Sequence, residues 1–134
     1  MKSKSLTLLL FSLGLIAIMM LSGCGGSSSS TSPSTTPVDV TGTWNVGSDG
    51  LGALVLTLAQ DVNGNITGTA TRTADAGTIT GSNISNNITL TITFPDGMIL
   101  TMTGVVSDNN NMSGTYNDNW GQSNNAAWSA TRAS

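Results

Sequence analysis

Hydrophobic and polar residues alternate along most of the chain beyond residue 37. The clearest run, residues 88–94, places Ile, Leu, Ile and Phe at every second position, with threonine between them. A leucine stands at every second position of residues 54–58. Because successive side chains of a β-strand point to opposite faces, this period of two predicts strands with one buried face.

A five-residue pattern recurs between these runs: an apolar residue, Thr or Ser, Gly, a small residue or Val, and a variable residue. It occupies residues 40–44, 66–70, 79–83, 102–106 and 112–116. Each glycine shares the parity of the apolar residue, so we expect it to face the interior or to mark a sharp bend. Glycine at such a position permits strong coiling and the close approach of a neighbouring strand.

Short turn sequences rich in Asp, Asn and Gly separate the segments. They lie at residues 61–64, 75–77, 85–87, 95–97 and 108–111. A last strand is expected at residues 126–132, and no segment beyond residue 37 carries the 3.6-residue apolar stripe of a helix. The sequence therefore predicts an all-β fold of eight short strands.

Eight strands with short connections form an antiparallel meander. A flat meander would expose two edge strands, which proteins avoid because free edges invite aggregation. The strand count and the inward glycines favour closure into an eight-stranded antiparallel up-and-down barrel. A two-sheet β-sandwich is the alternative, because it also suits regularly spaced short strands.

The first 24 residues follow the order of a secretory signal. Two lysines precede an apolar run at residues 6–21, which is shorter than the roughly 20 residues that a spanning helix needs. Residues 21–24, Leu-Ser-Gly-Cys, resemble the lipobox of bacterial lipoproteins, and Cys24 is the only cysteine. The resemblance implies that the Cys24 sulfur carries a diacylglycerol group, that the chain is cut between Gly23 and Cys24, and that the new amine is acylated. An uncleaved anchor or an ordinary secretory signal is the alternative.

The lipoprotein resemblance implies a location and a division of the chain. Two or three acyl chains anchor a protein durably to a membrane, which places this one in the bacterial cell envelope. Gly25, rather than Asp, follows the cysteine, and this favours the outer membrane. After the signal peptide at residues 1–23, residues 24–37 form a Ser/Thr/Pro-rich tether that cannot bury apolar surface. Residues 38–134 are then one small domain with a single core.

Composition restricts what this domain can do. Without the signal peptide its basic residues are Arg72 and Arg132, which face seven aspartates and leave a side-chain charge of −5. Such a domain is a poor partner for nucleic acid or anionic lipid surfaces. The chain has no His and no Glu, and the thiol of Cys24 would be lipidated. We therefore expect no catalytic residues, no metal site, no cofactor and no enzymatic activity.

The first and last strands carry a family signature. Gly42-Thr43-Trp44 and Arg132 resemble the Gly-x-Trp motif and the terminal Arg of the calycins, which include lipocalins, fatty-acid-binding proteins and avidins. The resemblance implies that Trp44 closes one end of a barrel and that Arg132 lies over its ring, a contact worth about 0.5–2 kcal/mol. Residues 40–44 and 63–69 are most similar to the first hairpins of avidin-type barrels. The aromatic residue that follows the second Gly-Thr in that pattern is missing here, so biotin binding is not implied.

Three aromatic residues near the end of the chain are candidates for contact with a ligand or a partner: Trp120, Trp128 and Tyr116. Trp120 lies in the polar loop 118–125, where an exposed indole can anchor a partner or simply cap the barrel. Leucine and methionine at residues 98–112 could line a pliable cavity, but core packing is their commoner role. Residues 61–65 have the spacing that begins a calcium loop, but its twelfth position holds Arg72 instead of an acid, so a hairpin turn is predicted.

Two hypotheses about function follow. The barrel could hold a small apolar ligand, or it could be filled by its own side chains and act as a structural or interaction lipoprotein that binds or inhibits another envelope protein. Interior volume separates them, because an eight-stranded barrel either holds one small ligand or is packed solid. About twenty-five inward positions are mostly large residues, which favours a filled barrel, whereas five inward glycines leave room.

Overall fold

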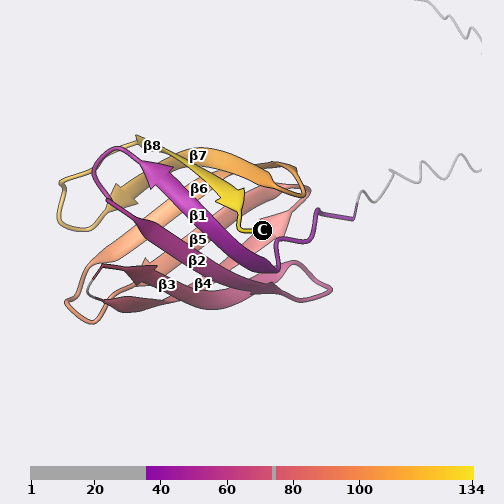
Figure 1. The fold of residues 1–134 in the computed structure, drawn as a ribbon, viewed down its shortest axis with the longest axis horizontal. Coiled ribbons are helices and arrows are strands. Elements are labelled where there is room, and N and C mark those ends of the chain that lie inside the picture. The colour runs from indigo at the N-terminus through magenta and orange to yellow at the C-terminus, as the bar shows by residue number, and fades with distance from the viewer. Residues whose placement is uncertain (1–35, 74) are drawn as a thin grey trace, which may run out of the picture. The chain divides into compact units, whose positions relative to one another are not determined.

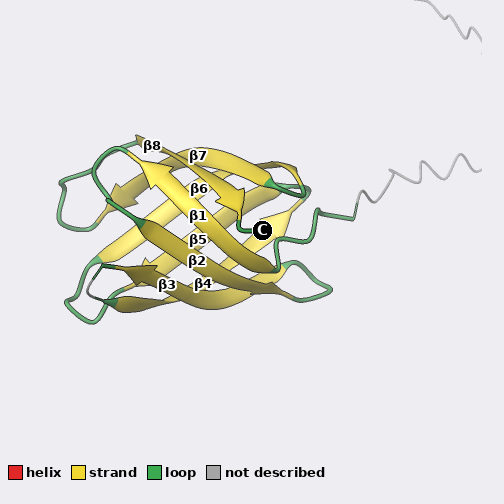
Figure 2. Ribbon diagram, viewed as in Figure 1, coloured by secondary structure: helices red, strands yellow, loops and turns green. Residues whose placement is uncertain are grey.

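The computed structural model describes residues 36–73 and 75–134, and there it contains eight strands joined by short loops (Figure 2). The strands are β1 (Gly42–Ser48), β2 (Leu54–Gln60), β3 (Asn65–Arg72), β4 (Ala76–Ile84), β5 (Asn87–Thr93), β6 (Ile99–Asp108), β7 (Asn111–Asp118) and β8 (Ala126–Arg132). Each predicted segment falls on one strand, and β8 has the predicted bounds. The first strand begins at Gly42, two residues into its sequence pattern. No helix in this part of the chain has the length and hydropathy needed to cross a membrane.

The strands form one closed antiparallel barrel (Figure 1). Each strand pairs with the next in sequence, and β8 returns to pair with β1. This last pairing runs from Trp44 opposite Arg132 to Ser48 opposite Trp128. The predicted up-and-down barrel is confirmed, and the sandwich alternative is wrong, because the β1–β8 pairing joins what would be the two edges of an open sheet.

Apolar side chains fill the interior of the barrel. They come from alternate positions of every strand, as the period of two requires. The buried apolar residues are Val40, Trp44, Val46, Leu54, Leu56, Leu58, Ile66, Ala70, Ile79, Ile88, Leu90, Ile92, Phe94, Leu100, Met102, Val106, Met112, Tyr116, Trp128 and Ala130. Because this set is continuous from one end of the barrel to the other, it forms a single packed core.

The inward glycines do not leave a cavity. A Cβ atom on Gly68 would collide with the carbonyl of Thr57 on β2. Gly104 and Gly114 lie opposite each other on β6 and β7, and a Cβ on Gly104 would come within 2.9 Å of the Trp128 ring. Neighbouring backbone and side chains therefore occupy the space above the glycines, which allow the sheet to coil tightly.

Threonine covers much of the outer surface in rows that run across the strands. Thr57, Thr69, Thr78 and Thr93 are successive cross-strand neighbours on β2 to β5. Such pairs contribute about 0.2–1 kcal/mol each relative to alanine pairs. The charged residues lie instead at the two ends of the barrel, so the ends carry its electrostatic character.

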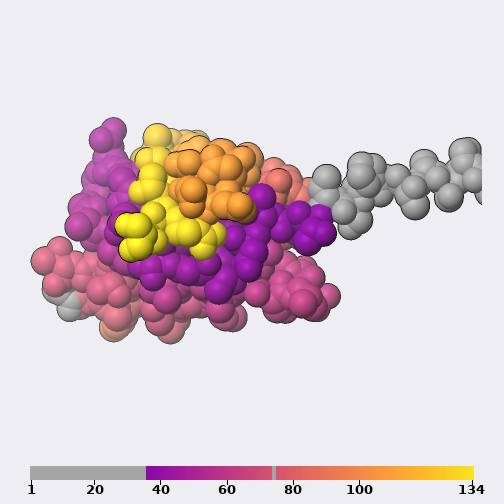
Figure 3. Space-filling model, turned by 45° about the vertical axis from the view of Figure 1, so that its right-hand side comes forward, coloured from indigo at the N-terminus to yellow at the C-terminus, as the bar shows by residue number. Residues whose placement is uncertain are grey.

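One end, which we call the closed end, is sealed by the segment that precedes β1. Val40 is fully buried there, and Asn83 of β4 donates to the carbonyl of Val38 at 2.8 Å. The amide of Val38 in turn donates to the Asn86 side chain at 2.8 Å. Figure 3 shows the C-terminal residues in yellow against the first strand in indigo, where the amide of Ala133 donates to the carbonyl of Thr43. The chain therefore enters and leaves the barrel at the closed end.

Candidate functional site

The opposite end of the barrel, which we call the mouth, is formed by alternate connections of the meander. In an up-and-down barrel every second turn lies at the same end, which brings together residues 49–53, the β3–β4 turn, residues 94–98 and residues 119–125. A cavity of about 180 Å³ opens between them. We take it as the candidate site, because concave apolar pockets at barrel mouths are common ligand sites.

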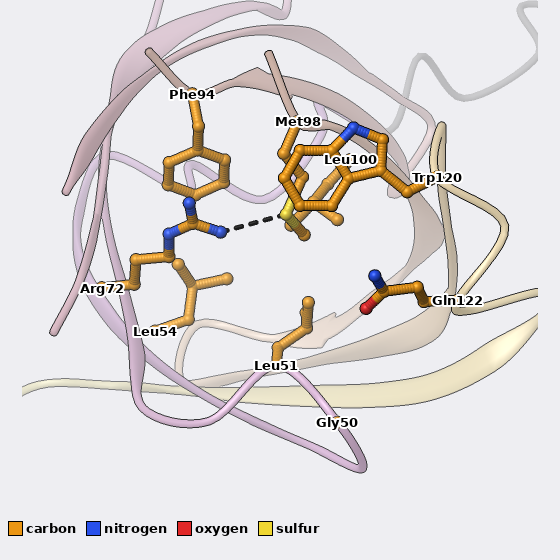
Figure 4. Close-up of a pocket in the computed structure, with 9 residues that line it drawn as sticks. All are labelled: Gly50, Leu51, Leu54, Arg72, Phe94, Met98, Leu100, Trp120 and Gln122. Atoms are coloured by element: carbon orange, nitrogen blue, oxygen red, sulfur yellow. Dashed lines mark hydrogen bonds between the residues drawn. The ribbon is translucent and has the colours of Figure 1, made fainter. Parts of the chain in front are cut away.

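The cavity has an apolar floor and a mixed rim (Figure 4). Leu54, Phe94 and Leu100 are buried core residues that form the floor. The remaining lining residues are Gly50, Leu51, Arg72, Met98, Trp120 and Gln122. Two polar side chains thus face an otherwise apolar recess, the pattern in which a few polar groups orient a bound molecule.

Arg72 forms one wall of the cavity. Its guanidinium lies over the Phe94 ring, with Cζ 4.1 Å from the ring centroid. Nη2 donates to Asp75 at 3.0 Å and also to Asp96. Nη1 points the other way and donates to the Met98 sulfur at 3.0 Å, as the dashed line in Figure 4 shows.

These contacts determine the charge of the Arg72 guanidinium and the Asp96 carboxylate. Partial burial alone would lower the pKa of Arg72, but its hydrogen bonds to Asp75 and Asp96 outweigh burial and raise it. The pKa of Asp96 is lowered, first by the backbone amide of Met98 and then by Arg72. The guanidinium and the Asp96 carboxylate are therefore both charged at neutral pH.

Hydrogen bonds hold the backbone of the loop that carries Trp120, one of the residues that line the cavity. Its amide and that of Gln122 donate to the Asp118 carboxylate, at 2.8 and 3.0 Å. Asn119 ties this loop to the β5–β6 connection, because its side chain accepts from the amide of Ile99 at 2.8 Å and donates to the carbonyl of Gly97 at 3.0 Å. The indole is 50% exposed. The cavity therefore has an accessible aromatic residue on a loop whose backbone is held in place.

The other two aromatic candidates lie beneath the surface. Tyr116 is fully buried, and its hydroxyl donates to the carbonyl of Asp49 at 2.7 Å and accepts from Ser123 at 3.2 Å. Trp128 is 3% exposed, and its Nε1 donates to the carbonyls of Thr103 and Thr115. Of the three candidates, the structure therefore brings only Trp120 to the cavity. Tyr116 links two of the loops that flank the cavity, residues 49–53 and 119–125.

The predicted signature residues meet at the closed end. Trp44 is buried, its Nε1 donates to the carbonyl of Val40 at 2.8 Å, and the Arg132 Cζ lies 4.5 Å from the centroid of its ring. Gly42 has a φ of +136°, and a Cβ there would come within 2.7 Å of the Arg132 guanidinium. Glycine is therefore needed at this position for its backbone and for its lack of a side chain.

Two other sequence predictions concern metal and lipid. The Asp61 carboxylate accepts from the amides of Asn63 and Asn65, at 2.8 and 2.9 Å, which is the predicted hairpin turn. Within residues 36–73 and 75–134, no three acidic, His or Cys side chains are grouped as metal ligands. Gly23 and Cys24, the predicted cleavage and lipidation site, lie outside the described residues.

Comparison with models of known protein families and with curated proteins found no match. The sequence alone predicts Trp120 as a contact residue and Met98 and Leu100 as core or cavity residues, but it gives Arg72, Phe94 and Gln122 no role in a site. The signal that could have found them is the order of the strands in the meander. Once the strands are numbered, the parity of the turns predicts which loops share an end.

Proposed function

We propose that the protein is a non-enzymatic binding protein of the bacterial cell envelope, and that its barrel mouth holds a small apolar molecule. The observation that carries the proposal is the cavity at the mouth, which has an apolar floor and is lined by the half-exposed Trp120. A site that is formed before binding loses little conformational entropy when the ligand arrives.

The size of the cavity limits the ligand to one ring or a short alkyl group. The cavity measures about 180 Å³. An apolar protein cavity of about 150 Å³ holds a benzene molecule, whereas drug-sized ligands occupy about 300–1,000 Å³. The packed core beneath Leu54 and Leu100 leaves no comparable room for a long acyl chain.

The position of the mouth suits an anchored protein. The described part of the chain enters the barrel at the closed end, where the amide of Val38 donates to Asn86. A lipid on Cys24 would therefore hold the domain by the closed end. The mouth, at the far end of the barrel, would stay accessible to a soluble molecule.

Ring binding tests this function directly. We expect ethylbenzene, titrated into the purified full chain in lipid nanodiscs, to shift the NMR signal of the Met98 methyl group, with empty nanodiscs as the reference. Trp120→Ala should weaken binding about tenfold and change unfolding free energy by less than about 0.5 kcal/mol, as exposed substitutions do. Val62→Ala, at a fully exposed apolar residue of the closed end, is the matched control and should leave binding unchanged. An unmoved Met98 signal up to the solubility limit would exclude the proposed site.

A protein-binding role is the second candidate, and the filled core of the barrel favours it. The exposed Trp120 could then occupy a pocket of another envelope protein. Asp118 and Asn119 directly precede Trp120 in the loop, and Asp96 lies at the same end of the barrel, so the apolar centre of such an interface would be small. Co-purification of one envelope protein by the wild-type chain and not by Trp120→Ala, together with no ring binding, would favour this role.

The anchor has its own test. We expect the mature wild-type protein to begin at Cys24 and to carry two or three acyl chains by mass spectrometry. Cys24→Ser removes the thiol nucleophile and should release the domain from the membrane fraction or leave an uncleaved precursor. Ser22→Ala, which keeps a small residue before the cysteine, should be processed normally. An unmodified and uncut wild-type chain would disprove the lipid anchor.

A further inference from the structure

Building on the function proposed above, we propose that the mouth selects a neutral, ring-sized molecule that carries one hydrogen-bond acceptor, such as a ketone or amide carbonyl. Arg72 Nη1 is the donor that this acceptor meets.

The first reason is that Arg72 Nη1, a strong hydrogen-bond donor, is paired with a weak acceptor. A guanidinium carries five N–H groups in a fixed plane, and the Phe94 ring holds that plane against the cavity wall. The Asp75 and Asp96 carboxylates take Nη2, but Nη1 faces the thioether of Met98, a poor acceptor. A ligand oxygen at this point would replace a weak hydrogen bond with a charge-assisted one.

The second reason is the charge around the cavity. The mouth holds Arg72 and four aspartates, which are Asp49, Asp75, Asp96 and Asp118. An anion would enter a region of net negative charge, although one positive group lines the cavity. A cation would have to lie beside the guanidinium. A neutral acceptor gains the hydrogen bond to Nη1 and avoids both repulsions.

Four probes of similar size separate these chemistries. Ethylbenzene has no acceptor, acetophenone has a neutral carbonyl, 1-phenylethylammonium is a cation and benzoate is an anion. Each is titrated into the full chain in nanodiscs, and the Met98 methyl signal is followed. We expect acetophenone to bind about tenfold more tightly than ethylbenzene, the usual effect of one hydrogen bond to a charged group. The two charged probes should bind more weakly than acetophenone.

Arginine variants at the two ends give a matched control. Arg72→Lys keeps the positive charge, but one ammonium cannot hold the carboxylates and also present a second nitrogen to the ligand. The preference for acetophenone over ethylbenzene should then fall from about tenfold to below about threefold. Arg132→Lys makes the same change at the closed end and should keep the full preference.

Each other outcome has a distinct meaning. Equal binding of acetophenone and ethylbenzene, or tightest binding of either ion, overturns the ligand class and leaves the proposed binding function intact. A preference that persists in Arg72→Lys excludes Arg72 as the donor. A Met98 signal that none of the four probes moves overturns the ligand class together with the binding function.

Discussion

The two arginines of the domain have the same kind of contact and different surroundings. Each guanidinium lies over an aromatic ring, Arg132 over Trp44 at the closed end and Arg72 over Phe94 at the mouth. A planar cation can stack on a ring and still donate hydrogen bonds within its plane. Arg132 gives its donors to three backbone carbonyls, whereas Arg72 leaves Nη1 against a sulfur. The first arrangement completes a seal, and the second leaves a donor for the ligand that we propose.

Substitutions at the closed end test the seal. Trp44→Ala should lower the free energy of unfolding by about 3–5 kcal/mol, as large aromatic truncations in cores do. Arg132→Ala should cost less, about 1–3 kcal/mol, because it removes a cation–π contact and three partly exposed hydrogen bonds. Urea denaturation followed by circular dichroism measures both. An unchanged midpoint for Trp44→Ala would show that the ring does not support the barrel.

At the scale of strands, paired glycines allow β6 and β7 to coil around the core. Gly104 and Gly114 face each other, and a Cβ on Gly114 would collide with the carbonyl of Thr103. Gly114→Ala should therefore cost about 1–3 kcal/mol of stability, the usual result of overpacking. Gly47→Ala on β1 is the control, because its nearest neighbour would be 3.7 Å from the new Cβ and nothing must move. Equal denaturation midpoints for the two variants would contradict this explanation of the glycine pattern.

The strands themselves could be predicted because their signal is local. Residues 88–94 alternate cleanly, and β5 occupies Asn87–Thr93. The start of β1 differs from the pattern because Val40 is buried outside the sheet, as part of the seal at the closed end. Alternation shows which residues of a segment are buried, but it does not show whether those residues lie in a strand or in an irregular segment.

Closure of the whole barrel and the site at its mouth depend on contacts between distant parts of the chain. The pairing of β1 with β8 joins residues 80 or more positions apart, as in Trp44 opposite Arg132, and leaves no local pattern. The cavity likewise combines Leu54, Arg72, Phe94 and Trp120 from four separate regions. The polar loop at residues 118–125 predicts an exposed tryptophan, but the folded barrel is needed to bring Arg72 and Trp120 into one cavity.

The charges at both ends of the barrel predict how the whole molecule responds to acid. Hydrogen bonds hold the pKa of five aspartates below the ordinary 3.8, even where burial opposes them. These are Asp39, Asp61, Asp96, Asp108 and Asp118. A carboxyl group whose pKa is lower in the folded state than in the unfolded state stabilises the fold at pH values above its unfolded-state pKa. This stabilisation is lost as the pH falls through the folded-state pKa. The chain has no histidine. The denaturation midpoint should therefore stay level from about pH 5 to pH 8 and fall below about pH 4.

Single substitutions can assign this acid response to the turns. In the Asp61 turn, the side chain of Asn65 is the largest cause of the lowered pKa, followed by its backbone amide. Asp61→Asn keeps an oxygen that can accept these hydrogen bonds but removes the titrating group. Its midpoint should fall less steeply than the wild type between pH 4 and pH 2, although its stability at pH 7 is lower. Asp49→Asn, where the carboxylate has no hydrogen-bond partner among the residues that the structure describes, is the control for removing one negative charge. If both variants lost stability in acid as steeply as the wild type, the hydrogen-bonded turns would not be the source of the acid response.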